Sequence, residues 1–313
     1  MKIFVTGVSG QLGRDVMVEL LRRAHLAIGT ARQIDNVELP QHMGSSDLDE
    51  MEPKLCILDL ADEKAVKSEI KIQKPDAVIH CAAWTDVDGA EDRNNWERVR
   101  AVNVRGTKNV AEAAKAVGAK MVYISTDYVF NGQGTTPWDP DCKDYAPLNV
   151  YGKSKLEGEL AVSELLKKYF IVRIAWVFGV NGKNFIRTML RVGQTHDEVR
   201  VVNDQIGTPT YTLDLSRLLV DMIGTDRYGY YHVTNEGGYI SWYDFTKEIY
   251  RQAGLSTKVT PVTTQEYGLS KAARPFNSRL DRSKIVKNGF TPLPDWRDAL
   301  ARYLKVLKNE GVY

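Results

Sequence analysis

The amino-acid sequence predicts an α/β protein built on a doubly wound parallel sheet, with a smaller α/β lobe at its C-terminal end. Two observations carry this prediction. Short apolar segments alternate with helix-period segments as far as residue 175, and such alternation requires right-handed crossovers between parallel strands. A glycine-rich turn, Gly7-x-x-Gly10-x-x-Gly13, also lies directly between the first apolar segment and the first helical pattern.

The first half of the chain contains the elements of this sheet in regular order. The predicted strands are short apolar runs bounded by polar or turn-forming residues, at 3–6, 26–30, 55–58, 77–82, 120–125 and 170–175. The predicted helices lie between them, over 11–23, 62–73 and 95–117 and from 151 onward. Residues 33–54 have no sustained period and contain Pro40, Gly44 and Pro53, so we predict a long surface loop there.

After residue 178 the regular alternation gives way to shorter elements. We expect strands at 199–202, 230–233 and 258–261, and helices at 184–195, 212–223, 241–253 and 295–308. No linker rich in Gly and Ser or in Pro separates the two halves. We therefore predict one domain over 1–178 and a second lobe over 179–313, interleaved with the first and packed on the carboxyl edge of its sheet.

Length and composition restrict the class of protein. With 313 residues, 43% of them hydrophobic, the chain can bury a core and is not disordered as a whole. A net charge of +2 does not indicate nucleic acid or an anionic membrane as a partner, and no apolar run approaches the roughly 18 residues of a membrane span. The N-terminus lacks the apolar region of a signal peptide. The three cysteines are too widely spaced for a disulfide framework or a zinc site, so we expect a cytoplasmic protein.

The glycine-rich turn predicts a dinucleotide site in the 1–178 domain, as in a Rossmann-like sheet. Glycine permits a tight turn and close approach of the backbone to a pyrophosphate, and the helix that begins at Gln11 and Leu12 supplies free N–H groups. A glycine turn without a ligand is the alternative, which the strand before it and the helix after it disfavour. The 179–313 lobe is then expected to bind mainly the substrate.

Residues at the ends of later strands are expected to complete the cofactor site. The second strand ends in Arg32 with no acidic residue, which favours the 2′-phosphate of NADPH over NADH. Asp59 and Leu60 follow the third strand and are expected at the adenine edge, although Asp59 also has the type and place of a helix cap. The residues expected to let a dinucleotide cross the sheet at its switch point are Ala82, Ala83 and Trp84.

Tyr151 and Lys155 form the strongest catalytic signal. They are four residues apart and therefore share one face of a helix, where the ammonium would lower the pKa of the phenol. Such a phenol can pass a proton to or from a sugar oxygen while a nicotinamide passes hydride. Thr126, which follows Ser125 at the end of the fifth strand, can bond the same oxygen; an ordinary strand-end hydroxyl is its alternative. His80 is expected to be a buried strand residue rather than a catalyst.

Longer segments carry a resemblance to a known family. The matching segments are the glycine turn, Asn103 and residues 59–60, 81–91, 125–132, 147–155, 173–179, 202–210 and 274–275. On these segments the chain resembles the extended short-chain dehydrogenase/reductase superfamily and, within it, the dTDP-4-dehydrorhamnose reductase family. The resemblance implies an NADPH-dependent reductase, with NADH as the alternative cofactor. Its implied reaction is reduction of the 4-keto group of a nucleotide-activated 6-deoxy sugar, converting dTDP-4-dehydro-L-rhamnose to dTDP-L-rhamnose.

The resemblance also implies roles for individual residues. Tyr151 is the implied proton donor, Lys155 binds the nicotinamide ribose and tunes Tyr151, and Thr126 positions the substrate. The residues implied to line the sugar pocket are Thr85, Asp127, Tyr128 and Trp176. Those implied to lie near the nucleotide half of the substrate are Asn184, Phe185 and residues 203–210. A core tryptophan is the alternative for Trp176. Two positions depart from the family pattern, because Asn131 stands where Asp is frequent and Trp84 where a smaller residue or His is common.

Other members of the superfamily supply the alternative functions. One alternative is a nucleotide-sugar epimerase or dehydratase, and another is a non-catalytic relative like the regulatory beta subunit of methionine adenosyltransferase. The expected partner is a nucleotide sugar, and a homodimer is compatible with the resemblance. Some bacterial members hold Mg²⁺ between subunits, and Asp15, Asp197 and Glu198 fall near the matching places. Exposed acids are usually only solvated, so we assign no metal.

Overall fold

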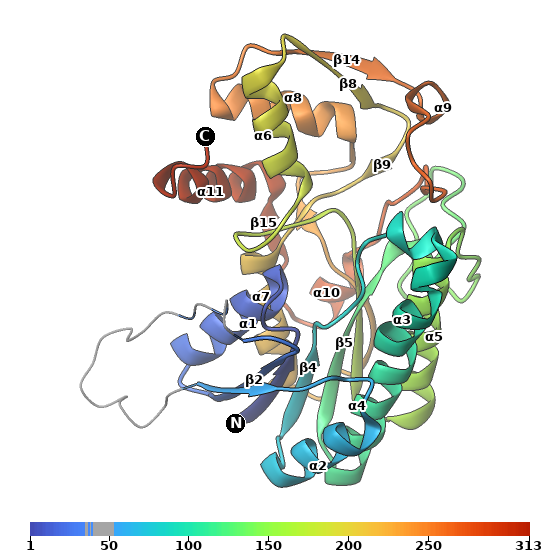
Figure 1. Ribbon diagram of the computed structural model, residues 1–313, viewed down its shortest axis with the longest axis vertical. Coiled ribbons are helices and arrows are strands. Elements are labelled where there is room, and N and C mark those ends of the chain that lie inside the picture. The colour runs from blue at the N-terminus through green and yellow to red at the C-terminus, as the bar shows by residue number, and fades with distance from the viewer. Residues whose placement is uncertain (35–36, 38, 40–52) are drawn as a thin grey trace.

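Seven parallel strands form the central sheet of the computed structural model, which describes residues 1–34, 37, 39 and 53–313 (Figure 1). Their order across the sheet is β3 (Lys54–Ile57), β2 (Leu26–Ala31), β1 (Lys2–Thr6), β4 (Ala77–His80), β5 (Lys120–Thr126), β6 (Tyr169–Ile174) and β11 (Gly229–His232). The α/β class and the parallel sheet predicted from the sequence are confirmed. Most of the loop predicted at 33–54 lies outside the described residues.

Helices cover both faces of this sheet, because both faces are apolar. On one face α1 (Gln11–Arg22), α7 (Thr212–Ile223) and α10 (Ser283–Lys287) share a hydrophobic cluster with the strands. On the other face α2 (Glu63–Gln73), α4 (Thr107–Val117) and α5 (Val150–Leu165) share a second cluster. The strand order reverses between β1 and β4, so the crevice at their carboxyl ends is the topological switch point at which ligands of such sheets bind.

Strand β11 shows how the two halves of the chain interleave. The sequence placed a strand at 230–233 among the elements of the C-terminal lobe, but the structure pairs it in parallel with β6 in the central sheet. Helix α7, from the same half, packs beside α1 (Figure 1). Apolar pattern alone identified both elements but not the sheet they join. The functional division at residue 178 stays a prediction.

The helix predicted over 95–117 is interrupted. It consists of α3 (Trp96–Arg100), a π-helical segment η3 (Ala101–Gly106) and α4. Within η3, the Asn103 side chain accepts a hydrogen bond from the Trp84 N–H (2.7 Å) and donates to the Trp84 carbonyl (3.2 Å). This pairing with a neighbouring loop accompanies the local change in helix winding, which apolar periodicity could not reveal.

The C-terminal lobe packs around an aromatic core. Its helices are α6 (Phe185–Thr195), α8 (Trp242–Ala253), α9 (Thr264–Tyr267) and α11 (Trp296–Asn309). Its paired strands are β8 (Glu198–Val202) with β14 (Lys258–Val262), β7 (Val177–Phe178) with β10 (Thr210–Tyr211), β9 (Ile206–Gly207) with β13 (Ile240–Ser241), and β12 (Asn235–Glu236) with β15 (Leu293–Asp295). Short 3-10 turns complete the described elements: η1 (Gly89–Glu91), η2 (Arg93–Asn95) and η4 (Asp127–Val129). None of the described helices combines the length and apolarity needed to cross a membrane.

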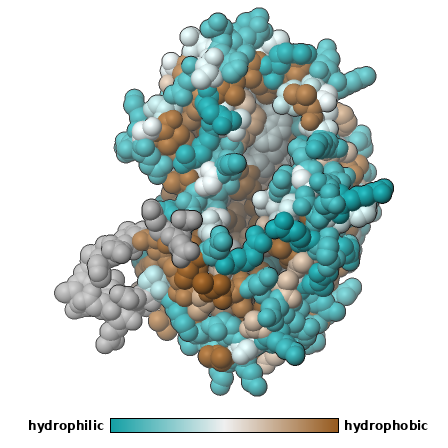
Figure 2. All heavy atoms as spheres, viewed as in Figure 1, coloured by the Kyte–Doolittle hydropathy of each residue, from teal (hydrophilic) through white to brown (hydrophobic). Residues whose placement is uncertain are grey.

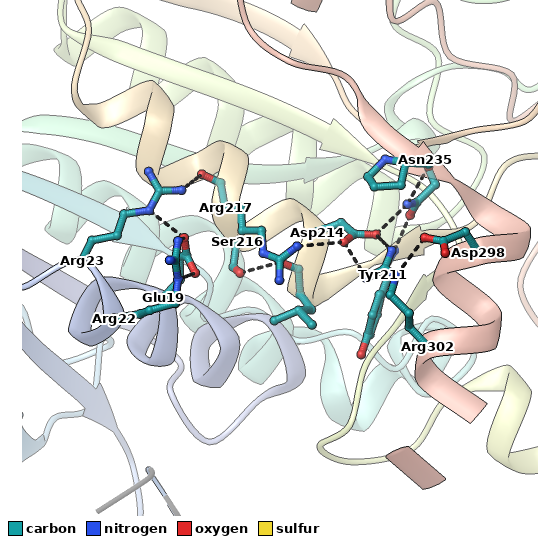
Figure 3. Close-up of polar contacts among 12 residues, drawn as sticks. Glu19, Arg22, Arg23, Tyr211, Asp214, Ser216, Arg217, Asn235, Asp298 and Arg302 are labelled. Atoms are coloured by element: carbon teal, nitrogen blue, oxygen red, sulfur yellow. Dashed lines mark hydrogen bonds and ion pairs between the residues drawn. The ribbon is translucent and has the colours of Figure 1, made fainter. Parts of the chain in front are cut away.

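A buried carboxylate ties α7 to the C-terminal lobe (Figure 3). Asp214, only 3% exposed, accepts two hydrogen bonds from the Arg302 guanidinium of α11, at 2.9 and 2.7 Å. Asn235 donates to the same carboxylate at 2.9 Å and accepts from the Tyr211 N–H at 2.7 Å. Because α7, α11 and β12 meet at one charge, this cluster fixes the lobe against the sheet.

Replacement of Asp214 by alanine should therefore destabilise the fold. The change leaves Arg302 and Asn235 without their shared acceptor, at an expected cost of about 3 kcal/mol in the free energy of unfolding. Asp298 provides the matched control, because it also pairs with Arg302 (2.8 Å) but is itself exposed. Asp298→Ala should cost less than about 1 kcal/mol. Urea unfolding measures the free energy of unfolding of both variants. Equal losses of stability would show that the burial of Asp214 is unimportant.

Candidate active site

A cavity of about 780 Å³ occupies the switch point at the carboxyl ends of the strands. Figure 2 shows the surface hollowed between the C-terminal lobe and the sheet-bearing part below it. The cavity is lined by every residue that the sequence proposed for the cofactor: Gly7, Gly10, Gln11, Leu12, Gly13, Arg32, Asp59, Leu60, Ala82, Ala83, Trp84, Tyr151 and Lys155. The fold thus gathers residues from the ends of four strands and from two helices around one space.

The glycine turn forms a cradle that side chains would fill. Gly7 has a φ of +74°, and a Cβ there would lie 2.7 Å from the Ala82 Cα. A Cβ on Gly13 would overlap the Gly7 carbonyl oxygen. Helix α1 begins after Gly10 with no side-chain cap, so its first N–H groups face the cavity unpaired by side chains. An anionic pyrophosphate fits this position, because backbone donors and the helix dipole both favour negative charge.

The adenosine end of the cavity is bounded by Arg32 and Asp59. Arg32 is exposed at the end of β2 and lines the cavity. Asp59 accepts a hydrogen bond from the Ala61 N–H at 2.9 Å, whereas the cap of α2 is Asp62, which accepts from the Ala65 N–H. Asp59 therefore shapes the turn before the helix and lines the cavity, and the cap itself lies three residues later.

Tyr151 and Lys155 lie in the first turns of α5, which begins at the N-cap Asn149. The Asn149 side chain accepts from the Gly152 N–H at 2.7 Å. Lys155 is 3% exposed and its Nζ lies 4.1 Å from the centre of the Tyr123 ring. Burial lowers the pKa of Lys155 to about 7, against the opposing influence of Glu159 and Cys81. In the protein alone, burial therefore favours the neutral amine of Lys155 over its ammonium form.

The sequence predicted a lowered pKa for Tyr151, and that prediction was wrong for the protein alone. Burial and the charge of Asp127 raise the pKa of Tyr151 well above its ordinary value, and a hydrogen bond with Thr126 offsets only part of the rise. The cause is that burial acts on Tyr151 and Lys155 together and disfavours both charged forms. Tyr151 is therefore fully protonated at neutral pH, which suits a proton donor.

Two buried polar atoms beside these residues lack partners among the described residues. Ser125 Oγ and Asp127 Oδ2 make no hydrogen bond of normal length, although both residues line the cavity. Burial raises the pKa of Asp127 to about 6, against hydrogen bonds from Ser278 and Thr126. Buried polar groups are rarely left unpaired, so these atoms indicate ligand contacts. Ser125 was not among the predicted site residues, although its place directly before Thr126 was a signal.

A second cavity, of about 550 Å³, continues the first into the C-terminal lobe. Both cavities are lined by Thr85, Tyr128 and Trp176, which the sequence proposed for the substrate, and by Trp242. Trp176 has a φ of +50° and stacks on Trp242 with ring centres 3.7 Å apart. Trp176 is half-buried and lines both cavities, so it lies in a cavity wall, and its contact with substrate stays a prediction.

The second cavity also contains cationic groups that the sequence analysis did not assign to the site. Arg200 and Arg274 line it, and Arg274 donates to Asp88 at 2.7 Å. The other terminal nitrogen of Arg274, Nη1, is buried without a hydrogen-bond partner. The Arg-Pro pair at 274–275 was noted as a family match, but without a ligand role. Its unpaired donor points to an anionic group in this cavity.

Asn184 does not join the substrate residues. It lines neither of the two cavities. The side-chain oxygen of Asn184, Oδ1, caps α6 by accepting from the Arg187 N–H. Its side-chain nitrogen, Nδ2, donates to Gln11 Oε1 at 3.1 Å and to the Tyr303 hydroxyl at 2.8 Å. The side chain is therefore fully used in joining α6 to the start of α1.

The acidic residues weighed as metal ligands are not assembled either. Asp15 is buried and accepts from the Thr212 hydroxyl at 2.6 Å, whereas Glu198 pairs with Lys258 in β8 and β14. The described part of the chain contains no group of three or more His, Cys, Asp or Glu side chains that could hold a metal ion.

Comparisons with known proteins agree with this geometry. The sequence profile of the RmlD substrate binding domain matches residues 1–309. The spore coat polysaccharide biosynthesis protein SpsK of Bacillus subtilis is 36% identical over 304 residues, covering 97% of each chain. A dTDP-4-dehydrorhamnose reductase structure from Clostridium acetobutylicum superposes with a TM-score of 0.84 at 39% identity, covering 98% of this chain and all of that one. The Bacillus anthracis enzyme of the same name, in complex with NADP, gives 0.82 at 37% identity, with coverage of 98% and 100%.

The cradle predicts opposite outcomes for two glycines with the same backbone angle. Gly7 and Gly118 both have a φ of +74°, but a Cβ on Gly118 meets nothing within 4 Å. Alanine at either position should cost about 1 kcal/mol of stability from the left-handed backbone. Gly7→Ala should in addition weaken NADPH binding by about tenfold or more, because its methyl group forces Ala82 away from the groove. Fluorescence titration measures the NADPH affinity of both variants. An equal loss of affinity in Gly118→Ala would show that the close approach of Gly7 to Ala82 is unimportant for binding.

Proposed function

The chain belongs to the RmlD substrate binding domain family, that of the dTDP-4-dehydrorhamnose reductases, and we propose that it is an NADPH-dependent reductase of a nucleotide-activated 4-keto-6-deoxy sugar. The substrate we propose is dTDP-4-dehydro-L-rhamnose, and the product dTDP-L-rhamnose. The observation that carries the proposal is the continuity of the two cavities across Thr85, Tyr128 and Trp176, beside Tyr151. A dinucleotide in one cavity and a nucleotide sugar in the other would meet there.

The residues at this junction suit the protonation half of a carbonyl reduction. When bound, NADPH supplies hydride to the carbonyl carbon. Tyr151 donates its proton to the carbonyl oxygen, and Thr126, which lines the same cavity, holds that oxygen in place. The Lys155 ammonium holds the ribose hydroxyls and stabilises the phenolate left on Tyr151. Thr126 and Lys155 are buried and Tyr151 is half-buried beside them, so little water reaches these groups and their interactions are strengthened.

The second cavity suits the rest of the substrate. Arg274, held by Asp88, and Arg200 supply cations for the diphosphate. Trp176 and Trp242 supply flat apolar surfaces for the sugar or base. Asp127 is placed to accept from a sugar hydroxyl. In this scheme residues 1–178 bind the dinucleotide and 179–313 mainly the substrate, and a cytoplasmic location and a homodimer complete the proposal.

A direct assay separates this proposal from the other members of the superfamily. Purified protein is mixed with dTDP-4-dehydro-L-rhamnose and NADPH, and the absorbance of the reduced cofactor is followed. A reductase consumes NADPH in proportion to the sugar. An epimerase or dehydratase changes the sugar without net consumption of NADPH, and a non-catalytic relative changes neither. NMR of the product then identifies the sugar stereoisomer.

Tyr151→Phe should abolish turnover and leave NADPH affinity nearly intact. The substitution keeps the ring and removes the proton donor, so only the chemical step loses its acid. We expect a fall in kcat of at least about a hundredfold, measured with saturating NADPH and substrate. NADPH titration of the same variant is the control. Turnover that survives would show that another group supplies the proton.

Arg32→Asp should reverse the cofactor preference. An acidic side chain at the end of β2 repels a 2′-phosphate and accepts from a 2′-hydroxyl. We expect NADPH affinity to fall by about tenfold or more relative to NADH. Arg191→Asp provides a control, because Arg191 is exposed on α6 and lines neither cavity. An unchanged NADPH-to-NADH ratio in Arg32→Asp would refute the role of Arg32 in cofactor choice.

A further inference from the structure

A row of three buried polar side chains crosses the sheet beneath the catalytic helix. Thr6 of β1 is the register partner of His80 of β4, and His80 is the partner of Tyr123 of β5. All three are at most 1% exposed. The row lies on the face covered by α4 and α5, as its contacts with Thr107 and Lys155 show. The proposed function has used none of these three residues.

The imidazole of His80 is locked in one neutral form. Its Nδ1 lies 2.8 Å from the Thr6 hydroxyl and its Nε2 lies 3.1 Å from the Thr107 hydroxyl. Thr107 donates its proton to the Asn103 carbonyl, so His80 Nε2 must be the donor and Nδ1 the acceptor. Burial and the charge of Lys155 lower the pKa of His80 to about 3, which keeps the ring neutral. This fixed ring stacks on Tyr123 with centres 5.8 Å apart.

Tyr123 contacts Lys155 in two ways. Its hydroxyl donates to the Lys155 main-chain carbonyl at 3.1 Å, and the face of its ring lies 4.1 Å from Nζ. A Cβ on Gly158, one turn after Lys155, would overlap the Tyr123 hydroxyl. Glycine at that position therefore allows α5 to approach the ring closely enough for both contacts.

Among the described residues no carboxylate forms an ion pair with Lys155, whose Nζ lies 4.1 Å from the centre of the Tyr123 ring. Glu159 faces the lysine from the next turn but is bound twice by Arg173, at 2.8 Å each, with both side chains fully buried. The other groups that face Lys155 carry no charge at neutral pH. They are His80, Tyr151 and Cys81, whose thiol has its pKa raised by burial to about 12.

We propose that Tyr123 is a positioning residue for Lys155: its ring face stabilises the buried ammonium in its charged form, and the His80 stack holds that ring in place. The catalytic consequence rests on the proposed function, but the effect on the lysine does not. The attraction between a cation and an aromatic face is stronger when the cation is desolvated than when it is exposed. This attraction offsets part of the free-energy cost of burying the charge.

The ring and the hydroxyl of Tyr123 can be tested separately by NMR. In protein labelled with ¹³C-lysine and without cofactor, the Cε resonance of Lys155 is the one that disappears in Lys155→Met. Its titration gives the Lys155 pKa directly. Tyr123→Phe keeps the ring and should leave this pKa unchanged. Tyr123→Leu removes the ring and should lower it by about one unit. Tyr123→Met, which fills the space more flexibly, serves if the leucine variant does not fold.

Tyr231→Leu is the matched control, because Tyr231 is a fully buried strand tyrosine with Lys284 over its ring at 5.5 Å. It should lower the melting temperature without moving the Lys155 pKa. An unchanged pKa in Tyr123→Leu, or an equal fall in Tyr123→Phe, would overturn the proposal.

The activity profile supplies a second readout. If charged Lys155 is needed, turnover falls as pH rises through its pKa, so the alkaline limb of Tyr123→Leu should shift to lower pH by about one unit. A shifted Lys155 pKa in a protein that reduces no 4-keto sugar would uphold this inference and reject the proposed reaction. Turnover of the 4-keto sugar together with an unchanged Lys155 pKa in Tyr123→Leu would uphold the proposed reaction and reject this inference.

Discussion

The close approach of two backbone segments at the switch point governs the rest of the site. Gly7 turns the chain away from β1 with a left-handed φ and lies very close to Ala82. A methyl group on Gly7 would force the two backbone segments apart. This contact sets the position of α1, whose first N–H groups open onto the cavity, and of the loop that continues to Trp84. Asn103 holds Trp84 from η3 and bonds Ser154 on α5, beside Lys155. The pyrophosphate cradle and the catalytic helix are thus linked through short, buried contacts.

Desolvation then determines the chemistry of that site. Lys155 and Asp127 are buried and Tyr151 is half-buried, and desolvation moves the pKa of each toward the neutral form. In an enzyme of the dTDP-4-dehydrorhamnose reductase type, this bias keeps the acid protonated before the reaction and makes the lysine responsive to small changes around it. The Tyr123 ring beside the lysine lies in the same desolvated region. The unpaired polar atoms of Ser125 and Asp127 lie there too.

Sequence reasoning succeeded where a local pattern has a local cause. Alternating apolar and helical segments gave the parallel strands, and glycine spacing located the cradle, because both depend on neighbours along the chain. It failed where distant segments decide the outcome. The pairing of β11 with β6, the π-helical winding around Asn103 and the tie between Asn184 and Gln11 all arise from tertiary contacts. The pKa of Tyr151 moved in the unexpected direction because burial and the charge of Asp127, which no spacing reveals, both raise it.

The contact between Gln11 and Asn184 also joins the two lobes beside the cofactor cavity. Gln11 lines the dinucleotide cavity, donates to the Lys183 carbonyl at 3.4 Å and accepts from Asn184, so one side chain touches both the cradle and the entry to the C-terminal lobe. Helix α6, which Asn184 caps, also places Phe185, Ile186 and Met189 in the wall of the second cavity. Two hydrogen bonds made by one glutamine therefore brace the helix that opens onto the dinucleotide cavity against the helix that borders the second one.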